Sequence, residues 1–129
     1  MIQRQLTFGE AVQRALTVNY CNFSGRSSRS EYWWFSLFSF IVSFVIMILF
    51  CWSDTLEYIV SGLCSLYFLL PTLGVSVRRL HDTGRSGWWI FINIIPFFGQ
   101  LIYLYFTIQP SQTVVNKWGP EPNMMETWN

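Results

Sequence analysis

The chain has 129 residues, of which 52% are hydrophobic, 19% are aromatic and only 12% are charged. Ordinary soluble domains carry roughly 25% charged residues, so this chain has too little charge to cover a soluble surface. The formal net charge of +1 excludes the strong basic field that attracts nucleic acid, so we expect no nucleic-acid partner. The three cysteines and the single histidine show no metal-ligand spacing, so we expect no metal and no cofactor.

Residues 6–19 predict a short amphipathic helix. Thr7 and Glu10 have the spacing of a capping box, which satisfies two free backbone N–H groups at a helix start. Apolar side chains then share one helical face: Phe8, Ala11, Val12 and Ala15. Such a helix would lie along the inner leaflet of a membrane or pack on neighbouring loops, and the sequence leaves both arrangements open.

Three long windows contain no charged residue and no histidine: 33–52, 58–77 and 88–108. About 20 apolar residues in a helix cross the hydrocarbon core of a membrane. So short a chain could not bury three helices that are apolar all round, which excludes a soluble helical core. We therefore predict an all-α integral membrane protein with three transmembrane helices, in which residues 1–129 form a single membrane domain and 109–129 form a polar tail. Tryptophans lie at the window ends, as expected for interfacial anchors: Trp33, Trp34, Trp52, Trp88 and Trp89.

The polar residues beside and within the spans indicate where helices begin and where they touch. Ser28 and Glu31 have capping-box spacing, so the first span is expected to begin near Arg29. Within the spans, Ser, Thr, Asn and Gln recur at helical spacing and predict helix–helix contact faces, with a solute path as the alternative. Pro71 and Pro96 are expected to kink their helices because proline removes a backbone donor.

Residues 78–87, with the sequence RRLHDTGRSG, are the richest polar motif of the chain. Its arginines could meet anionic headgroups, Ser86 is a plausible N-cap for the next helix, and Trp88 then enters the interface. A second polar motif, at residues 20–32, precedes the first span. The two motifs together contain the candidate lipid- or partner-binding residues, and we identify no catalytic or metal-binding residue in them. The candidates are Arg26, Arg29, Glu31, Arg78, Arg79, His81, Asp82, Arg85, Ser86, Trp88 and Trp89.

The distribution of Arg and Lys predicts an orientation. Basic residues gather in the N-terminal segment and in 78–87, whereas the first connection, 53–57, has only acidic charges. The positive-inside rule therefore places the N-terminus and the 78–87 loop in the cytoplasm. After a third crossing the C-terminal tail would lie in the periplasm.

Three motifs resemble one known family. They are FSGRSSRSEYWWF at 23–35, RRLHDTGRSGWW at 78–89 and NKWGPEP at 116–122. They are similar to the bacterial inner-membrane family called domain of unknown function 805, with a likeness over residues 7–122. The resemblance implies a small multi-pass protein of the bacterial cytoplasmic membrane. It implies no activity and no catalytic residue, because none is established for that family.

Three functions follow from these observations. The first is a membrane module that binds lipid, particularly anionic headgroups, or a protein partner, including a second copy of the chain. The alternative is an oligomeric channel or transporter component, although the spans lack the ionisable groups that such proteins usually carry. The least favoured is a lipid-headgroup enzyme using His81 and Asp82, because no phosphate loop or nucleophile elbow accompanies them, and we expect the chain not to be an enzyme.

Overall fold

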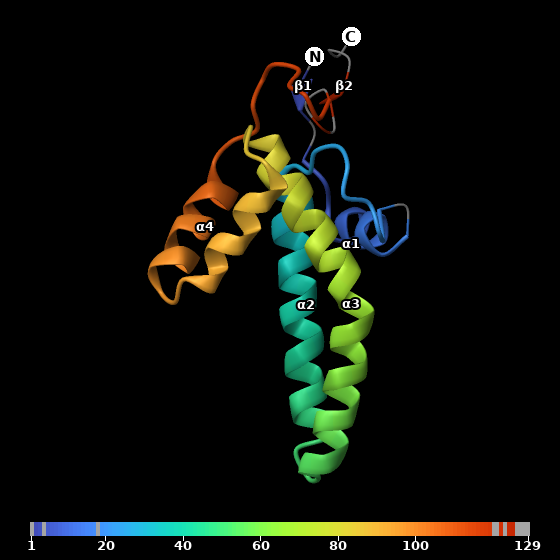
Figure 1. The fold of residues 1–129 in the computed structure, drawn as a ribbon. Coiled ribbons are helices and arrows are strands. Elements are labelled where there is room, and N and C mark those ends of the chain that lie inside the picture. The colour runs from blue at the N-terminus through green and yellow to red at the C-terminus, as the bar shows by residue number, and fades with distance from the viewer. Residues whose placement is uncertain (1, 4, 18, 120–121, 123, 126–129) are drawn as a thin grey trace.

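The fold consists of two long helices that carry a packed head at one end. The computed structural model describes residues 2–3, 5–17, 19–119, 122 and 124–125. In chain order the elements are β1 (Ile2–Gln3), α1 (Phe8–Leu16), α2 (Arg29–Leu49), α3 (Asp54–Asp82), the 3₁₀ helix η1 (Gly87–Ile94), α4 (Phe98–Ile108) and β2 (Met124–Met125). Figure 1 shows α2 and α3 side by side, with α1 against one side of their upper end and α4 on the other. We call residues 5–35, 71–87 and 107–119 the head.

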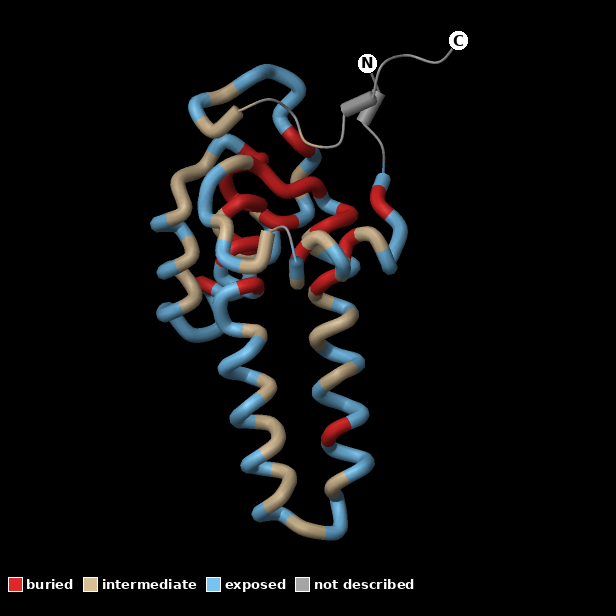
Figure 2. Tube along the Cα trace, turned by 90° about the vertical axis from the view of Figure 1, so that its right-hand side faces the viewer, coloured by how far each residue is buried: buried red, intermediate tan, exposed pale blue. Residues whose placement is uncertain are grey.

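The two long helices fit a membrane by length and by surface. α2 has 21 residues and α3 has 29, which corresponds to about 31 and 43 Å, against about 30 Å of hydrocarbon. Both are apolar enough to cross a bilayer, and most of their apolar side chains are exposed. Figure 2 shows the buried residues gathered in the head and few along the two helices. Such exposure suits a lipid-facing pair and not the core of a soluble protein.

These two helices contain the predicted spans. The window 33–52 falls on α2 and its C-terminal turn, and 58–77 lies wholly within α3. Because α3 is longer than the hydrocarbon core is thick, its last residues, 78–82, extend beyond the spanning segment into the head.

Local capping determines where the first two helices begin, as predicted. The Thr7 hydroxyl accepts from the Glu10 backbone N–H, and the Glu10 side chain accepts from Thr7, which completes the capping box of α1. Ser28 accepts from the Glu31 N–H at 3.3 Å and starts α2. The Glu31 carboxylate bonds Arg78.

A small apolar core fastens α1 to the long helices. Ala15 of α1, Phe35 of α2 and Val75 of α3 are buried together. Leu6, just before α1, is also buried, and its backbone N–H donates to the Ser30 hydroxyl at 2.9 Å. The apolar face of α1 therefore packs on α2 and α3, and not on the neighbouring loops.

The prediction of a third spanning helix over 88–108 is wrong. The window folds into two short helices, η1 and α4, which pack against each other and reverse direction between them. We call residues 87–108 the hairpin. Both of its ends lie at the head, so the chain does not cross to the far end of α2 and α3 a third time.

Pro96 and its neighbours explain the reversal. Proline lacks a backbone N–H and disfavours helical backbone in the preceding residue, and Ile95 is accordingly extended at φ −75° and ψ 114°. Phe97 adopts a positive φ of 65°, which a helix does not allow. A Cβ on Gly99 would lie 1.9 Å from the Ile92 carbonyl oxygen, so only glycine fits this close crossing. The predicted kink at Pro96 is thus a full turn, whereas α3 continues through Pro71.

The N-terminal and C-terminal segments meet at the same end of the molecule. β1 pairs antiparallel with β2, Ile2 opposite Met125 and Gln3 opposite Met124. This pairing places the described part of the tail beside the N-terminal segment and so does not support the predicted tail on the opposite side of the membrane. The pair of two-residue strands also modifies the expected all-α fold. Residues 120–121, 123 and 126–129 of the predicted tail lie outside the described residues.

Candidate functional site

Asp82 lies at the centre of a buried ion network at the end of α3. Arg26 Nε donates to Asp82 Oδ1 at 3.0 Å, while Arg79 and the Ser111 hydroxyl both donate to Oδ2. All four residues are buried. A buried charge is tolerated only when it is paired and hydrogen-bonded, and Asp82 meets that condition with three donors. Its carboxylate is therefore committed to the fold and is not available as a general base.

Two arginines share one carboxylate, and the C-terminal segment stabilises the additional positive charge. Arg26 Nη1 donates to the carbonyls of Val114 at 3.0 Å and Gly119 at 3.2 Å. Arg79 Nε donates to the Thr107 carbonyl at 3.0 Å. Further carbonyl acceptors of the two guanidiniums are those of Ser27, Asp82, Gln109 and Gln112. Because guanidinium offers five donors in a fixed fork, these two side chains hold residues 107–119 against the rest of the head.

A second buried ion pair joins α3 to the start of α2. Arg78 Nη1 donates to Glu31 Oε1 at 2.8 Å, and Arg78 Nε donates to the Asn22 carbonyl at 3.0 Å. Arg78 Nη2 is one of two buried side-chain atoms in the described part of the chain that have no hydrogen-bond partner, the other being Ser27 Oγ. Arg78 and Glu31 therefore act first as structural connections.

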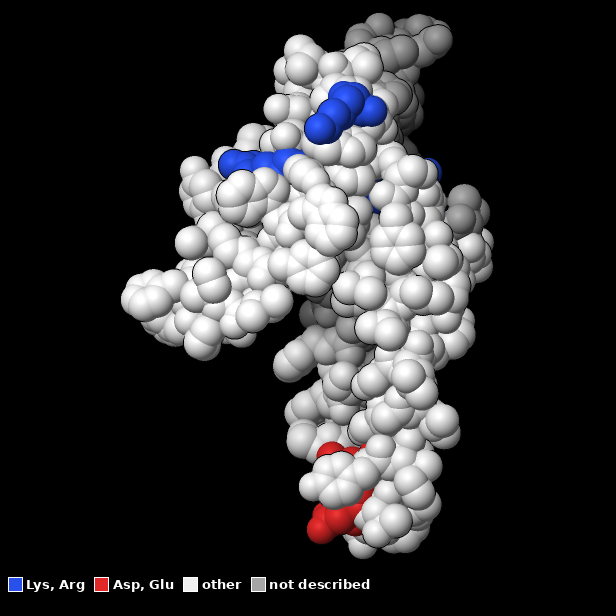
Figure 3. Space-filling model, in the orientation of Figure 1, with Lys and Arg blue, Asp and Glu red and all other residues white. Residues whose placement is uncertain are grey.

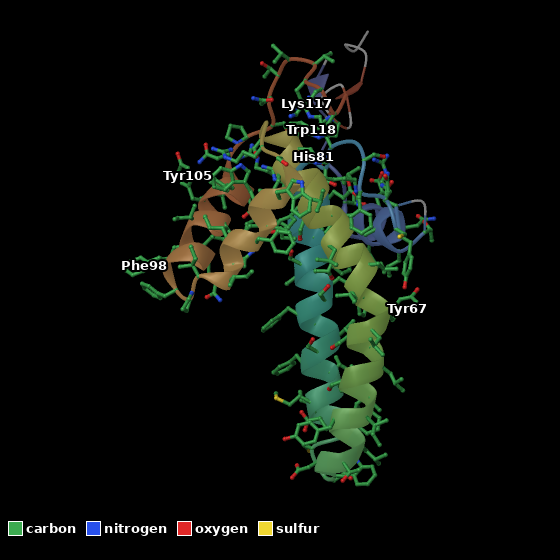
Figure 4. The ribbon with its side chains drawn as sticks, viewed as in Figure 1. Tyr67, His81, Phe98, Tyr105, Lys117 and Trp118 are labelled. Atoms are coloured by element: carbon green, nitrogen blue, oxygen red, sulfur yellow. The ribbon has the colours of Figure 1, made fainter. Side chains whose placement is uncertain are left out.

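His81 has one ring nitrogen bound and the other open. Its Nδ1 lies 2.9 Å from the Gly25 carbonyl, which can only accept, so Nδ1 carries the proton and Nε2 is an acceptor. The ring stacks on Trp118 with centroids 4.4 Å apart and planes 5° apart. Burial, aided by the nearby Lys117 ammonium and opposed by the Gly25 bond, holds the pKa of His81 below its ordinary value. Figure 4 shows His81, Trp118 and Lys117 together at the head.

The open face of His81 lies at a cavity of about 490 Å³ between α3 and η1. We call it the α3–η1 groove. Most of its walls are apolar, and its lining includes Phe23, Leu73, Val77, His81, Gly87, Phe91 and Trp118. A Cβ on Gly87 would lie 2.7 Å from a Val77 methyl and 3.5 Å from His81 Nε2, so the glycine keeps this wall open. The volume is within the range of roughly 300–1,000 Å³ that small-molecule sites occupy.

The remaining candidates lie at the surface. Arg29 is exposed, and Arg85 is half-buried, with its guanidinium 4.0 Å from the centroid of the Phe106 ring and NH1 donating to the Thr83 carbonyl at 3.3 Å. Ser86 accepts from the Trp88 backbone N–H at 3.4 Å and caps η1, as predicted. The side chains of Trp88 and Trp89 are exposed. The structure thus divides the candidates into two sets: residues buried inside the head, and residues at the surface that are exposed or half-buried.

The geometry does not assemble a catalytic pair from His81 and Asp82. His81 bonds Gly25, whereas Asp82 bonds two arginines and a serine. Within the described ranges no group of three or more His, Cys, Asp or Glu could hold a metal ion.

Sequence reasoning missed the contribution of the tail to this region. Trp118 covers His81, Ser111 bonds Asp82, and the Asn116 side chain donates to the His81 carbonyl at 2.9 Å. The motif NKWGPEP was the available signal, because it contains an aromatic residue and an amide in an otherwise turn-forming segment.

Comparison with known proteins identifies the family. The family described as "Protein of unknown function (DUF805)" matches residues 20–120. Inner membrane protein YhaH of Escherichia coli (strain K12) is 39% identical over 110 residues, which cover 82% of this chain and 91% of YhaH. Inner membrane protein YhaI of the same organism is 40% identical over 107 residues, covering 81% of this chain and 88% of YhaI. No solved structure matches. The resemblance inferred from the three motifs is confirmed, and this membrane protein belongs to the DUF805 family.

Proposed function

We propose that the chain is a lipid-interacting module of the bacterial cytoplasmic membrane. In this arrangement α2 and α3 cross the bilayer, and the hairpin enters only the cytoplasmic leaflet. The names of YhaH and YhaI as inner membrane proteins support the location. The observation that carries the proposal is the length and surface of the hairpin.

The hairpin reaches about half the depth of a membrane. η1 has eight residues and α4 has eleven, and at their usual rises each arm measures about 16 Å, against about 30 Å of hydrocarbon. Large apolar side chains are exposed on both arms and at the tip: Trp88, Phe91, Ile94, Ile95, Phe97, Phe98, Leu101, Ile102 and Tyr105. Exposed apolar surface on this scale favours contact with lipid.

The backbone of the tip is compatible with that depth. Any unsatisfied backbone donor in hydrocarbon costs several kcal/mol. Pro96 has no N–H, the Ile95 N–H donates to the Ile92 carbonyl at 3.1 Å, and the Phe98 N–H donates to the Pro96 carbonyl at 2.7 Å. The turn therefore supplies its own acceptors at these positions without water.

Charge supports a cytoplasmic head. Figure 3 shows Lys and Arg at the upper end and Asp and Glu at the lower tip of the molecule. The lower tip carries Asp54 and Glu57 in the first turn of α3. By the positive-inside rule the head, with both terminal segments, lies in the cytoplasm and the connection between α2 and α3 lies in the periplasm.

Contact with anionic headgroups then rests on Arg29, Arg85 and Lys117, which we call the surface cations. Arg26, Arg78 and Arg79 are buried and bonded inside the head, so they are poorly placed to meet lipid. Each basic residue near an anionic leaflet contributes about 1 kcal/mol. The indoles of Trp88 and Trp89 suit the same interfacial layer.

The topology is tested with reporters fused to each end of the full chain. A fluorescent reporter that matures only in the cytoplasm is expected to be bright at both termini, and a phosphatase active only in the periplasm is expected to be inactive at both. Phosphatase activity at the C-terminus would overturn the one-leaflet hairpin.

The lipid interaction is tested by mass spectrometry of protein released from nanodiscs of phosphatidylethanolamine and phosphatidylglycerol. Arg85→Gln is expected to lower retention of phosphatidylglycerol about fivefold, the effect of roughly 1 kcal/mol. Arg85→Lys, which keeps the charge, is the matched control and is expected to retain more than the Gln variant. Equal retention by all three proteins would refute the role of Arg85.

A further inference from the structure

The α3–η1 groove changes from apolar to polar along its length. Leu73, Val77 and His81 follow one another at intervals of four residues on the same face of α3, which spans about 12 Å. On the opposite wall, Gly87 lies at the head end of η1 and Phe91 lies further toward the hairpin tip. The groove is therefore apolar on the membrane side and polar where it meets the head.

The polar end offers a distinct set of groups. His81 Nε2 is an acceptor, because Nδ1 donates to the Gly25 carbonyl. Trp118 forms the adjacent wall, and the Lys117 ammonium lies 4.5 Å from the centroid of its ring. The His81 ring covers one face of Trp118 and the Lys117 ammonium lies over the other, so a ligand at this end meets the Nε2 acceptor, which suits a headgroup that carries an ammonium or hydroxyl donor.

We infer that the α3–η1 groove binds one phospholipid of the cytoplasmic leaflet, with an acyl chain along Leu73, Val77 and Phe91 and a donor-bearing headgroup at His81 Nε2. This inference rests on the proposed placement of the hairpin in that leaflet, where the surrounding molecules are phospholipids oriented in the same direction as the groove. The apolar end faces the bilayer centre and the polar end faces the headgroup layer.

Filling the groove tests the acyl chain. Leu73→Trp places a large ring in the open wall, where Leu73 is already 36% exposed, so the fold tolerates the change. Leu66→Trp makes the same substitution on the same helix at a residue 69% exposed and outside the groove. In mass spectrometry of protein released from phosphatidylethanolamine nanodiscs, Leu73→Trp is expected to lower the fraction with one tightly held lipid roughly tenfold, and Leu66→Trp to leave it unchanged. Equal retention by wild type and Leu73→Trp would overturn the inference.

Exchanging the headgroup tests His81. Phosphatidylethanolamine has an ammonium donor, whereas phosphatidylcholine has the same phosphate and no N–H. The wild type is expected to retain phosphatidylethanolamine about fivefold better, the effect of one hydrogen bond. His81→Asn, whose amide can keep the bond to Gly25, is expected to lose this preference. A wild type that retains both lipids equally would overturn the headgroup assignment.

The outcomes separate this inference from the proposed function. A periplasmic C-terminus overturns the placement of the hairpin and, with it, the cytoplasmic-leaflet lipid. If both termini are cytoplasmic and Leu73→Trp does not change lipid retention, lipid binding in the groove is refuted, whereas the placement of the hairpin in the membrane is not.

Discussion

Replacing Asp82 by Asn tests whether the buried ion network holds the head together. The carboxylate neutralises Arg26 and Arg79, and all three side chains are at most 1% exposed. Removing one partner of a buried ion pair costs about 3–5 kcal/mol, because an uncompensated charge is left behind. Here two guanidiniums lose their shared anion, so we expect a loss near 5 kcal/mol, a large part of the roughly 5–15 kcal/mol that stabilises a typical protein.

The assay is equilibrium unfolding of the purified protein in mixed micelles by increasing dodecyl sulfate, followed by tryptophan fluorescence. Asp54→Asn is the matched control, because it removes an exposed carboxylate from the other end of α3 and is expected to cost at most about 1 kcal/mol. Combining Asp82→Asn with Arg26→Gln should cost less than the sum of the single changes, since the two groups interact directly. If Asp82→Asn unfolds at the same point as Asp54→Asn, the network does not stabilise the head.

Three further outcomes follow from local geometry. Gly99→Ala is expected to lower the free energy of unfolding by about 1–3 kcal/mol in the same assay, because the new methyl would overlap the Ile92 carbonyl, whereas Gly62→Ala enters open space and should cost nothing. Thr7→Ala removes the N-cap of α1 and is expected to cost about 1 kcal/mol, measured as a lower thermal midpoint. Stability should fall as the pH drops below about 6.5, because the pKa of His81 is lowered in the folded protein and the unfolded chain takes up the proton first. The His81→Asn variant should lose less stability than the wild type over this range below about pH 6.5.

Local patterns predict much of the fold because they act over a few residues. Thr7 and Ser28 cap helices through bonds to residues three positions later, and an uncharged window of sufficient length defines each crossing. The third window has the composition of a span and fails for a geometric reason. Pro96 and Gly99 together permit the chain to reverse direction, which hydropathy does not measure. Nothing in the sequence predicts the positive φ of the adjacent Phe97.

The roles of the arginines could not be predicted in the same way. Arg26 bonds a carboxylate 56 positions away and a carbonyl 93 positions away, and sequence spacing does not reveal such partners. An arginine beside a membrane span looks the same in sequence whether it meets a headgroup or a buried aspartate. Burial separates the two cases: Arg79 is completely buried, whereas Arg29 is exposed.

The carbonyls that receive Arg26 also impose an order on biosynthesis. Arg26 leaves the ribosome 88 residues before Val114 and 93 residues before Gly119, whose carbonyls accept from it. Translation proceeds at roughly 5–20 residues per second, so several seconds separate this guanidinium from its acceptors. α2 and α3 are therefore synthesised before the head can close, and during that interval the Arg26 guanidinium lacks these acceptors.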